Sequence, residues 1–155
     1  MKKIRLILED DEENLAVGLV RLIQSMPDYE FFFHINKINN TEFRRVKDME
    51  KRGVYYDYYH TCFEAYIKEA KANYLFISNK SIKSNRIKQI RELFVEEEEV
   101  NYLLPEYKDV DFILKISDGF DDFSLILSLE NLAFSIQNFQ LSSDEELYQL
   151  IQYYE

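Results

Sequence analysis

The sequence has few of the residues on which several classes of functional site depend. It contains three glycines, two prolines, one cysteine and no tryptophan in 155 residues. With three isolated glycines the chain has no glycine-rich loop for a phosphate, and the motifs GxxxxGK(S/T), GxGxxG, HExxH and GxSxG are absent. These absences argue against a nucleotide-dependent enzyme. They favour a protein that is not an enzyme and needs no cofactor.

The single cysteine, Cys62, excludes a disulfide within the chain and a CxxC metal framework. A lone thiol is ordinary in a reducing compartment, so we expect a cytoplasmic protein. The N-terminal apolar stretch meets acidic residues after about five apolar positions, which is too few for a secretion signal. No apolar run approaches the roughly 18 residues that cross a membrane. We therefore expect no membrane association.

Aromatic side chains and acidic charge are abundant instead. The chain has 12 tyrosines and 12 phenylalanines, and its 46% hydrophobic content is enough to bury a core without metals or disulfides. We expect one domain over residues 1–155. The net charge is −10, but residues 44–91 hold 12 of the 19 basic residues against five acidic ones. Residues 44–91 therefore have a net charge of +7, and the rest of the chain has a net charge of −17. This balance disfavours nucleic acid as a partner except at residues 44–91.

The hydrophobic pattern predicts an α+β fold with a mainly antiparallel sheet and helices packed on it. Residues 15–24 fit either a helical stripe or a buried strand. The unit at 109–141 is predicted to be a C-terminal βαβ unit, ferredoxin-like in plan. Strands are predicted at 2–8, 41–49, 54–67, 72–78, 109–117 and 133–141, and helices at 25–39, 81–94, 121–132 and 143–155.

Two of the predicted helices begin with capping residues. Ser25 is the expected N-cap of the first, with Pro27 in its first turn. Ser143 and Glu146 have the spacing of a capping box at the start of the last. The first helix is expected to be mostly buried, through a face that contains Tyr29, Phe32, Phe33 and Asn36, with Phe31, Ile35 and Ile38 beside it.

Six carboxylates between residues 106 and 122 are the densest group of candidate functional side chains. Converging carboxylates bind Mg²⁺ or Ca²⁺, or divide acid and base roles between them. Turn and cap positions explain several of them equally well, because Asp118-Gly119 is a turn pair and acids favour the first turn of a helix. We favour the structural interpretation and assign no catalytic or metal site. The six are Glu106, Asp109, Asp111, Asp118, Asp121 and Asp122.

His60 and Cys62 are two residues apart on a predicted strand and therefore share a face. They could form half of a metal site or a thiol with its base. The only other histidine is His34, so either set would be incomplete. We expect a packed core cysteine and a hydrogen-bonded histidine.

Alternation along the strand at 54–67 places Tyr56, Tyr58 and His60 on one face and Tyr55, Tyr59 and Phe63 on the other. One face must belong to the core. We predict that the face with Tyr56, Tyr58 and His60 is exposed and is an interaction face, because exposed tyrosines favour protein contacts. Aromatic residues among basic ones also suit single-stranded RNA.

The segment LPEYKDVDF, residues 104–112, resembles the signature of the IPExxxVDY family. Pro105, Glu106, Val110 and Asp111 match it, while Leu104 replaces isoleucine and Phe112 replaces tyrosine. The segments LVRLIQSMPDYEFFFHINKI, RRVKDME and ANYLFISNKS are also similar and occur in the expected order. The resemblance implies a strand at 15–24 and a small bacterial protein of a family with no agreed activity or catalytic residues.

Together these observations predict a non-enzymatic adaptor or regulatory protein that acts through contacts with a protein partner. A small-molecule-binding regulatory module is the first alternative, and an RNA-binding protein is the second. A homo-oligomer is compatible with the sequence. Glu106 and Asp111 either face a ligand or brace the sheet, and we expect them to brace it.

Overall fold

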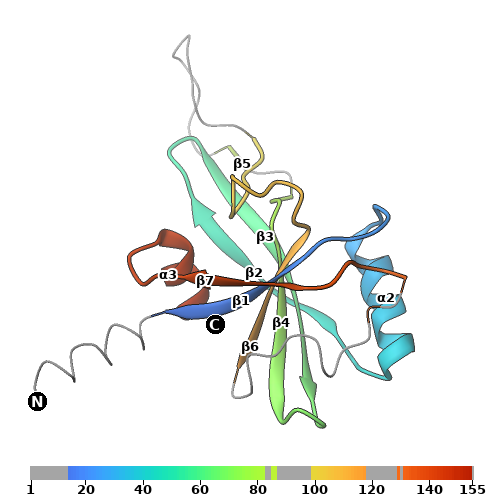
Figure 1. The fold of residues 1–155 in the computed structure, drawn as a ribbon. Helices are drawn as coiled ribbons and strands as arrows, with labels where there is room; N and C mark the ends of the chain where they lie inside the picture. Colours follow the sequence, from blue (N-terminus) through green and yellow to red (C-terminus); the bar gives the residue numbers. More distant parts are fainter. Residues whose placement is uncertain (1–13, 83–84, 87–98, 118–128, 130, 155) are drawn as a thin grey trace, which may run out of the picture.

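Six strands form one antiparallel sheet in the order β2-β3-β4-β6-β1-β7 (Figure 1). The computed structural model describes residues 14–82, 85–86, 99–117, 129 and 131–154. A short strand, β5 (Asn85–Arg86), pairs with the beginning of β3. The other strands are β1 (Leu15–Val20), β2 (Arg44–Arg52), β3 (Tyr56–Ile67), β4 (Ala72–Ser78), β6 (Phe112–Ser117) and β7 (Gln137–Leu141).

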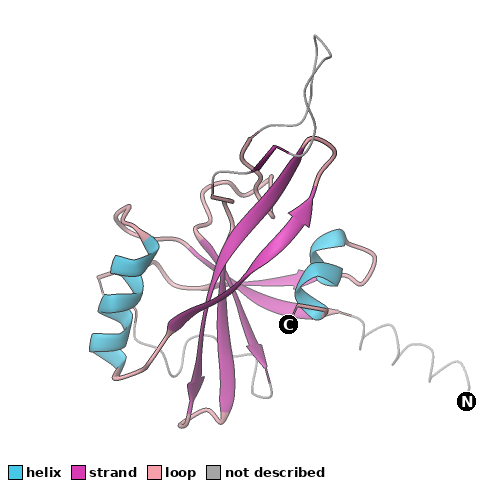
Figure 2. Ribbon diagram, turned by 180° about the vertical axis from the view of Figure 1, so that it is seen from behind, coloured by secondary structure: helices cyan, strands magenta, loops and turns pink. Residues whose placement is uncertain are grey.

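Helices α2 (Asp28–Asn39) and α3 (Glu146–Gln152) lie on opposite sides of the sheet (Figure 2). Successive residues of a strand point to opposite faces, so each central strand contributes to both cores. On β6, for example, Leu114 belongs to the cluster on the α2 face and Ile113 to the cluster on the α3 face. The predicted α+β class with a mainly antiparallel sheet is confirmed.

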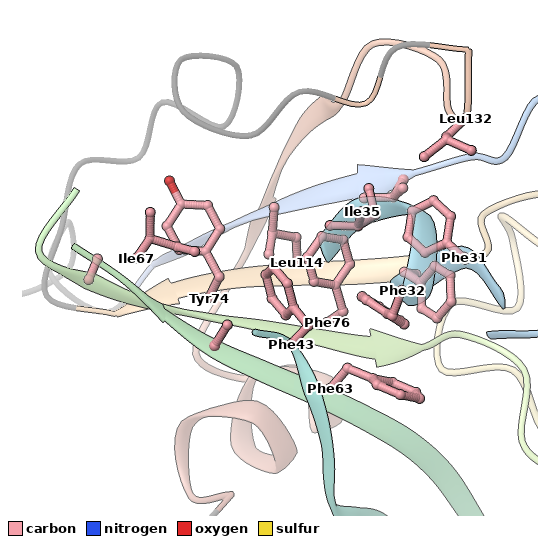
Figure 3. Packing of buried hydrophobic residues seen from close by; sticks show 14 residues of the cluster. Phe31, Phe32, Ile35, Phe43, Phe63, Ile67, Tyr74, Phe76, Leu114 and Leu132 are labelled. Atoms are coloured by element: carbon pink, nitrogen blue, oxygen red, sulfur yellow. The ribbon is translucent and has the colours of Figure 1, made fainter. Parts of the chain in front are cut away.

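The core on the α2 face is built from phenylalanines (Figure 3). Phe32 of α2 stacks on Phe63 of β3 with ring centroids 4.2 Å apart and meets Phe76 of β4 edge-on at 5.1 Å. Phe31 stacks on Phe112 at 5.3 Å. Such pairs add about 0.5–1.5 kcal/mol each beyond the apolar area that they bury.

The core on the α3 face is aliphatic. Ile77 of β4 and Ile113 of β6 are buried there beneath Leu147 and Ile151 of α3. The Lys115 ammonium also contacts the Ile151 carbonyl oxygen at 3.4 Å, near the C-terminal end of α3. A cation at this end interacts favourably with the helix dipole.

Helix α2 begins at Asp28, so the prediction of Ser25 as its N-cap is wrong. Pro27 is the N-cap, with an extended backbone, and its carbonyl accepts the N–H groups of Glu30 and Phe31 at 3.1 Å. A residue that precedes proline is disfavoured in helical geometry, which moves the helix start past Met26. The predicted end at Asn39–Asn40 is confirmed, since Asn40 adopts the left-handed conformation that closes a helix.

The buried face of α2 also differs from the predicted one. Phe31, Phe32 and Ile35 are buried, whereas Tyr29 is 71% exposed and Phe33 is 62% exposed. Neighbouring aromatic residues left the direction of the inward face ambiguous in the sequence. The sheet determines which side of the helix is buried, because its phenylalanines stack on Phe31 and Phe32.

The capping box predicted for Ser143 and Glu146 is displaced. Helix α3 begins after Glu145, and the Ser142 N–H and hydroxyl both donate to the Glu145 carboxylate, at 2.9 and 3.1 Å. Glu146 instead lies 3.6 Å from the Lys51 ammonium of β2. The helix is therefore tied to the sheet by a residue that was expected to cap it.

Several predicted elements can be compared with the structure only in part. The strand at 15–24 is confirmed as β1, and the strand at 72–78 is confirmed as β4. The helix predicted at 81–94 is wrong at Asn85–Arg86, which pair as a strand with β3. The strand at 2–8 lies outside the described residues, as does nearly all of the helix at 121–132.

The βαβ unit remains a prediction. Both β6 and β7 pair antiparallel with β1, which lies between them, so they run parallel to each other one strand apart. The helix expected in their connection is outside the described residues, and so is the ferredoxin-like plan that depends on it. Among the residues that are described, no helix has the length and apolar character needed to cross a membrane.

Candidate functional site

The family-like segment forms a loop that is organised by one buried residue, Asn79. We call residues 103–111 the signature loop. The Asn79 side chain accepts the Leu104 N–H at 2.8 Å and donates to the carbonyl oxygens of Tyr107 and Val110 at 2.9 and 3.0 Å. Its backbone N–H donates to the Asp111 carbonyl, and its own carbonyl accepts the Leu103 N–H. Asn79 thus determines the path of the loop at five points.

Sequence reasoning missed Asn79. The relevant pattern is a polar residue directly after the buried strand Ala72–Ser78, where a buried amide must find hydrogen-bond partners inside the protein. Its partners lie 25 to 31 residues further along the chain, so local patterns could not identify them.

Asp111 braces the sheet through three hydrogen bonds. Its backbone N–H donates to the Val20 carbonyl at 2.8 Å, and its carboxylate accepts the Leu22 N–H at 2.8 Å. Its carbonyl accepts from Asn79, so one residue joins the ends of β1 and β4. Partial burial raises the pKa of the Asp111 carboxyl, and the neighbouring Asp109 charge raises it further, while the Leu22 N–H opposes both.

Asp109 has a separate role on the same loop. It accepts a hydrogen bond from Arg21 Nε at 2.7 Å, and Arg21 also donates to the Gln137 side chain of β7 at 2.9 Å. The hydrogen bond from Arg21 holds the pKa of the Asp109 carboxyl below its usual value. Asp109 and Asp111 therefore each accept a hydrogen bond from the segment that follows β1.

Of the four remaining carboxylates, only Glu106 lies in the described part of the chain. Asp118, Asp121 and Asp122 lie outside the described residues. Glu106 is exposed and has no hydrogen bond or ion pair with another described residue. Within the described part of the chain, no group of three or more histidine, cysteine, aspartate or glutamate side chains is arranged to hold a metal ion.

The signature divides into a buried and an exposed half. Leu104, Val110 and Phe112 are buried in the two cores. Pro105 and Glu106 are exposed at the tip of the loop. Asp111, which also matches the signature, is exposed as well, so another molecule can reach both the tip of the loop and its end.

The interaction face assigned to Tyr56, Tyr58 and His60 is not on the surface. The three residues are 8%, 4% and 0% exposed. Strand β3 has neighbours on both sides, β2 on one and β4 with β5 on the other, and most of its side chains are buried. The alternation was predicted correctly, but the sequence did not reveal that the face of this strand with Tyr56, Tyr58 and His60 is interior at these three residues.

His60 and Cys62 are inert core residues, as expected. His60 Nδ1 lies 2.9 Å from the Ser78 carbonyl, which can only accept, so Nδ1 carries the proton and Nε2 accepts from the Asn101 amide at 3.2 Å. Burial lowers the pKa of His60 to about 4 and raises that of Cys62 to about 11. Neutral His60 holds the 99–103 segment, and the Cys62 thiol has little nucleophilic thiolate at neutral pH.

A continuous concave surface lies along α3. Two open hollows of about 600 and 390 Å³ adjoin there and share Glu146 and Leu150 in their walls. Together we call them the α3 groove, which is lined by residues 47–51, 103–107 and 145–154 with Tyr59 and Phe139. A third hollow, of about 650 Å³, continues from Lys51, Pro105 and Glu146 toward residues 100–102.

The α3 groove exists because α3 is short and lies across only part of its sheet face. Its C-terminal end is held where the Tyr154 hydroxyl donates to the Lys47 carbonyl, beside a bulge between Val46 and Met49 of β2. At the other end, Tyr107 of the signature loop meets Phe139 of β7 edge-on at 5.5 Å. These contacts leave an apolar floor between the helix, β2 and the loop.

The rim of the α3 groove is acidic. Five carboxylates and two ammonium groups line it, a formal charge of −3. Some of these charges are paired, such as Lys51 with Glu146, but Glu106 has no partner among the described residues. The carboxylates are Asp48, Glu50, Glu106, Glu145 and Glu146, and the ammonium groups are Lys47 and Lys51.

No family model, curated protein or solved structure matches this chain. The resemblance to the IPExxxVDY family therefore remains a prediction that rests on the residues of the signature loop and on the order of the other similar segments.

Proposed function

We propose that this chain is a non-enzymatic cytoplasmic adaptor or regulatory protein that binds a basic, apolar segment of a partner protein in the α3 groove. The observation that carries the proposal is the combination of an apolar floor with an acidic rim in the two adjoining hollows. A segment that carries apolar and basic residues would bury its apolar side chains on the floor and place its cations beside the rim.

The shape of the groove supports a peptide more than a compact ligand. Small-molecule sites bury most of their ligand in a cleft or cavity, whereas these hollows are open and follow one another along α3. Tyrosine is prominent in the walls, at Tyr59, Tyr107, Tyr153 and Tyr154. An amphipathic ring of this kind provides apolar area and a polar hydroxyl, which is why tyrosine is enriched at protein interfaces.

The family resemblance supports the same location. Of the exposed signature residues, Pro105 and Glu106 line the groove, whereas Asp111 lies outside it. In this proposal Asn79 and Asp111 support the loop from within, and Glu106 offers its carboxylate to a cation of the partner.

The test uses two synthetic peptides, one of alternating lysine and leucine and one with glutamate in place of lysine. Binding is measured by fluorescence anisotropy at two salt concentrations. We expect the lysine peptide to bind and the glutamate peptide not to bind, with an affinity that decreases as salt screens the rim. The double variant Glu50→Lys with Glu106→Lys should weaken binding of the lysine peptide at least about tenfold, or about 1.4 kcal/mol.

A matched control separates the groove from the overall acidity of the chain. Glu42→Lys with Glu69→Lys makes the same change in charge at exposed residues of a different hollow, which lies beside the end of α2. This variant should bind the lysine peptide much as the parent chain does. Equal weakening by both double variants, or no binding of the lysine peptide at all, would contradict a binding site in the α3 groove.

A small-molecule-binding regulatory module is the second candidate function. It is favoured by the 390 Å³ hollow, which is within the size range of ligand sites and has apolar walls from Leu103, Leu104 and Phe139. The predicted ferredoxin-like plan adds only an analogy with ligand-sensing domains. A thermal-shift screen against metabolites and divalent ions distinguishes this candidate, because a compact ligand would raise the melting temperature without any peptide.

RNA binding has less support. Tyr56 and Tyr58 are buried and cannot stack on bases. Basic residues of β2 are also engaged with acids, Arg45 with Asp48 at 3.0 Å and Arg52 with Asp57 at 3.1 Å.

A further inference from the structure

The two edge strands of the sheet differ in charge. Strand β2 at one edge has charged side chains at seven of its nine positions and a bulge, both of which hinder pairing with another strand. Strand β7 at the other edge, Gln137-Asn138-Phe139-Gln140-Leu141, has none. Natural sheets protect their edges with charge, so the unprotected β7 is the edge that is open to strand addition.

The outer side of β7 has no strand partner among the described residues, since its only pairing is with β1. The backbone N–H and C=O groups on that side need hydrogen-bond partners, either water or another strand. Asn138 and Gln140 are exposed on one face of β7, while Phe139 packs toward Tyr107 on the other. The edge therefore presents amides and an aromatic ring beside unpaired backbone.

We propose that the occupant of this edge is a second copy of the same chain, with the two β7 strands antiparallel about a two-fold axis at Phe139. This register places Phe139 opposite Phe139 and Asn138 opposite Gln140 on both sides of the axis. An aromatic pair and two amide pairs are favourable cross-strand neighbours, and a two-fold contact requires a self-complementary surface of this type.

Electrostatics favours this edge for contact between two copies. Each chain has a net charge of −10, so two copies repel each other over most of their surfaces. An uncharged strand is the place where their backbones can approach without like charges opposite each other. A basic or acidic partner segment would find no counter-charge on β7, which is why a second copy fits better than a charged peptide.

The first test is the solution mass of the full chain, measured by sedimentation equilibrium over a range of protein and salt concentrations. The monomer is 18.8 kDa, and we expect twice that mass as protein concentration rises. Added salt should strengthen association, because it screens the repulsion between two acidic chains. A mass that stays at 18.8 kDa throughout would overturn the proposal.

The double variant Asn138→Lys with Gln140→Lys places lysine opposite lysine in both amide pairs. We expect its dimer dissociation constant to rise at least about tenfold, since like charges that lie directly opposite oppose pairing. Gln24→Lys with Gln152→Lys adds the same charge at exposed positions outside β7 and should associate as the parent chain does. Equal association of the β7 variant and the parent chain would rule out this interface.

A second measurement does not depend on destabilising the dimer. In the double variant Asn138→Cys with Gln140→Cys, the proposed register brings each new thiol opposite one on the other copy, within reach of a disulfide. Mild oxidation should yield a covalent dimer, and Cys62 does not interfere because it is buried. A dimeric variant that fails to cross-link would show that the copies meet elsewhere. None of these variants alters the Glu50 and Glu106 positions used to test the α3 groove, so the two proposals can fail separately.

Discussion

The two faces of the sheet are covered in different ways. The α2 face carries a helix of 12 residues, about 18 Å long, and a layer of phenylalanines from α2, β3, β4 and β6. The α3 face carries a helix of seven residues, about 10 Å long, over aliphatic side chains. The long helix completes a core, whereas the short one leaves room for the signature loop and the α3 groove.

The difference shows how one sheet separates stability from recognition. Interlocking rings on the α2 face bury the inner side of the helix and leave its outer side exposed. On the α3 face, polar contacts from Asn79, Lys51 and Tyr154 hold the loop and the helix in place around an open surface. Substitutions on the α2 face should mainly lower the free energy of unfolding. Substitutions on the α3 face should lower the free energy of unfolding and also weaken peptide binding.

The largest expected effect is on the α2 face. Phe32→Ala removes a ring that stacks on Phe63 and meets Phe76 edge-on, and it should lower the free energy of unfolding by about 3–5 kcal/mol in urea denaturation. Phe33→Ala on the exposed side of the same helix should change it by less than about 0.5 kcal/mol. Similar losses from both variants would contradict the assignment of the buried side of α2.

Asn79→Ala should have the next largest effect, on the α3 face. It removes three side-chain hydrogen bonds and leaves the Leu104 N–H and two carbonyl oxygens of the loop unsatisfied, which should cost about 3 kcal/mol of unfolding free energy. Unlike Phe32→Ala, it should also weaken lysine-peptide binding under conditions where the variant is folded. Asp109→Asn, on the same loop but exposed, should change little in either measurement. Unchanged stability of Asn79→Ala would show that the loop does not depend on this residue.

Acid should destabilise the link between His60 and the 99–103 segment. The pKa of His60 is about 4 in the folded chain against 6.5 in the unfolded chain, so between these values the unfolded state binds more protons. Stability should therefore be retained above pH 6.5 and decrease as pH falls toward 4, by up to about 3 kcal/mol from this residue.

The variant His60→Gln provides the comparison for the pH effect. Its unfolding free energy should be lower at neutral pH but should lack the histidine contribution to the slope between pH 6.5 and 4. The quantity to measure is the difference in slope between parent and variant, because the carboxylates titrate in both. Parallel pH profiles would contradict a pKa of His60 that is lower in the folded chain than in the unfolded chain.

The smallest effect is expected at the end of α3. Tyr154→Phe removes the hydroxyl that donates to Lys47 and should lower the free energy of unfolding by about 1 kcal/mol. Because Tyr154 lines the α3 groove, lysine-peptide binding should weaken as well. Tyr153→Phe alters an exposed hydroxyl on the neighbouring residue and should leave stability unchanged.

Much of the sheet could be predicted from local pattern. The strand at 72–78 and most of those at 41–49 and 54–67 follow from dense β-forming residues between turns, and the turn of residues 68–71 is present with Lys71 at positive φ. The site was harder to predict. Sequence reasoning selected Tyr56, Tyr58 and His60, which are buried, and it missed Asn79 and the α3 groove.

The sequence by itself determined the α+β class, the alternation of side chains along each strand and the lack of nucleotide-binding motifs, because these depend on residue types and on neighbours a few positions apart. Tertiary structure decided which side of α2 is buried, that Tyr56, Tyr58 and His60 of β3 are buried and how the signature loop is held. Those outcomes depend on pairs such as Val20 with Asp111 and Lys51 with Glu146, which are distant in the sequence and meet only when the sheet is assembled.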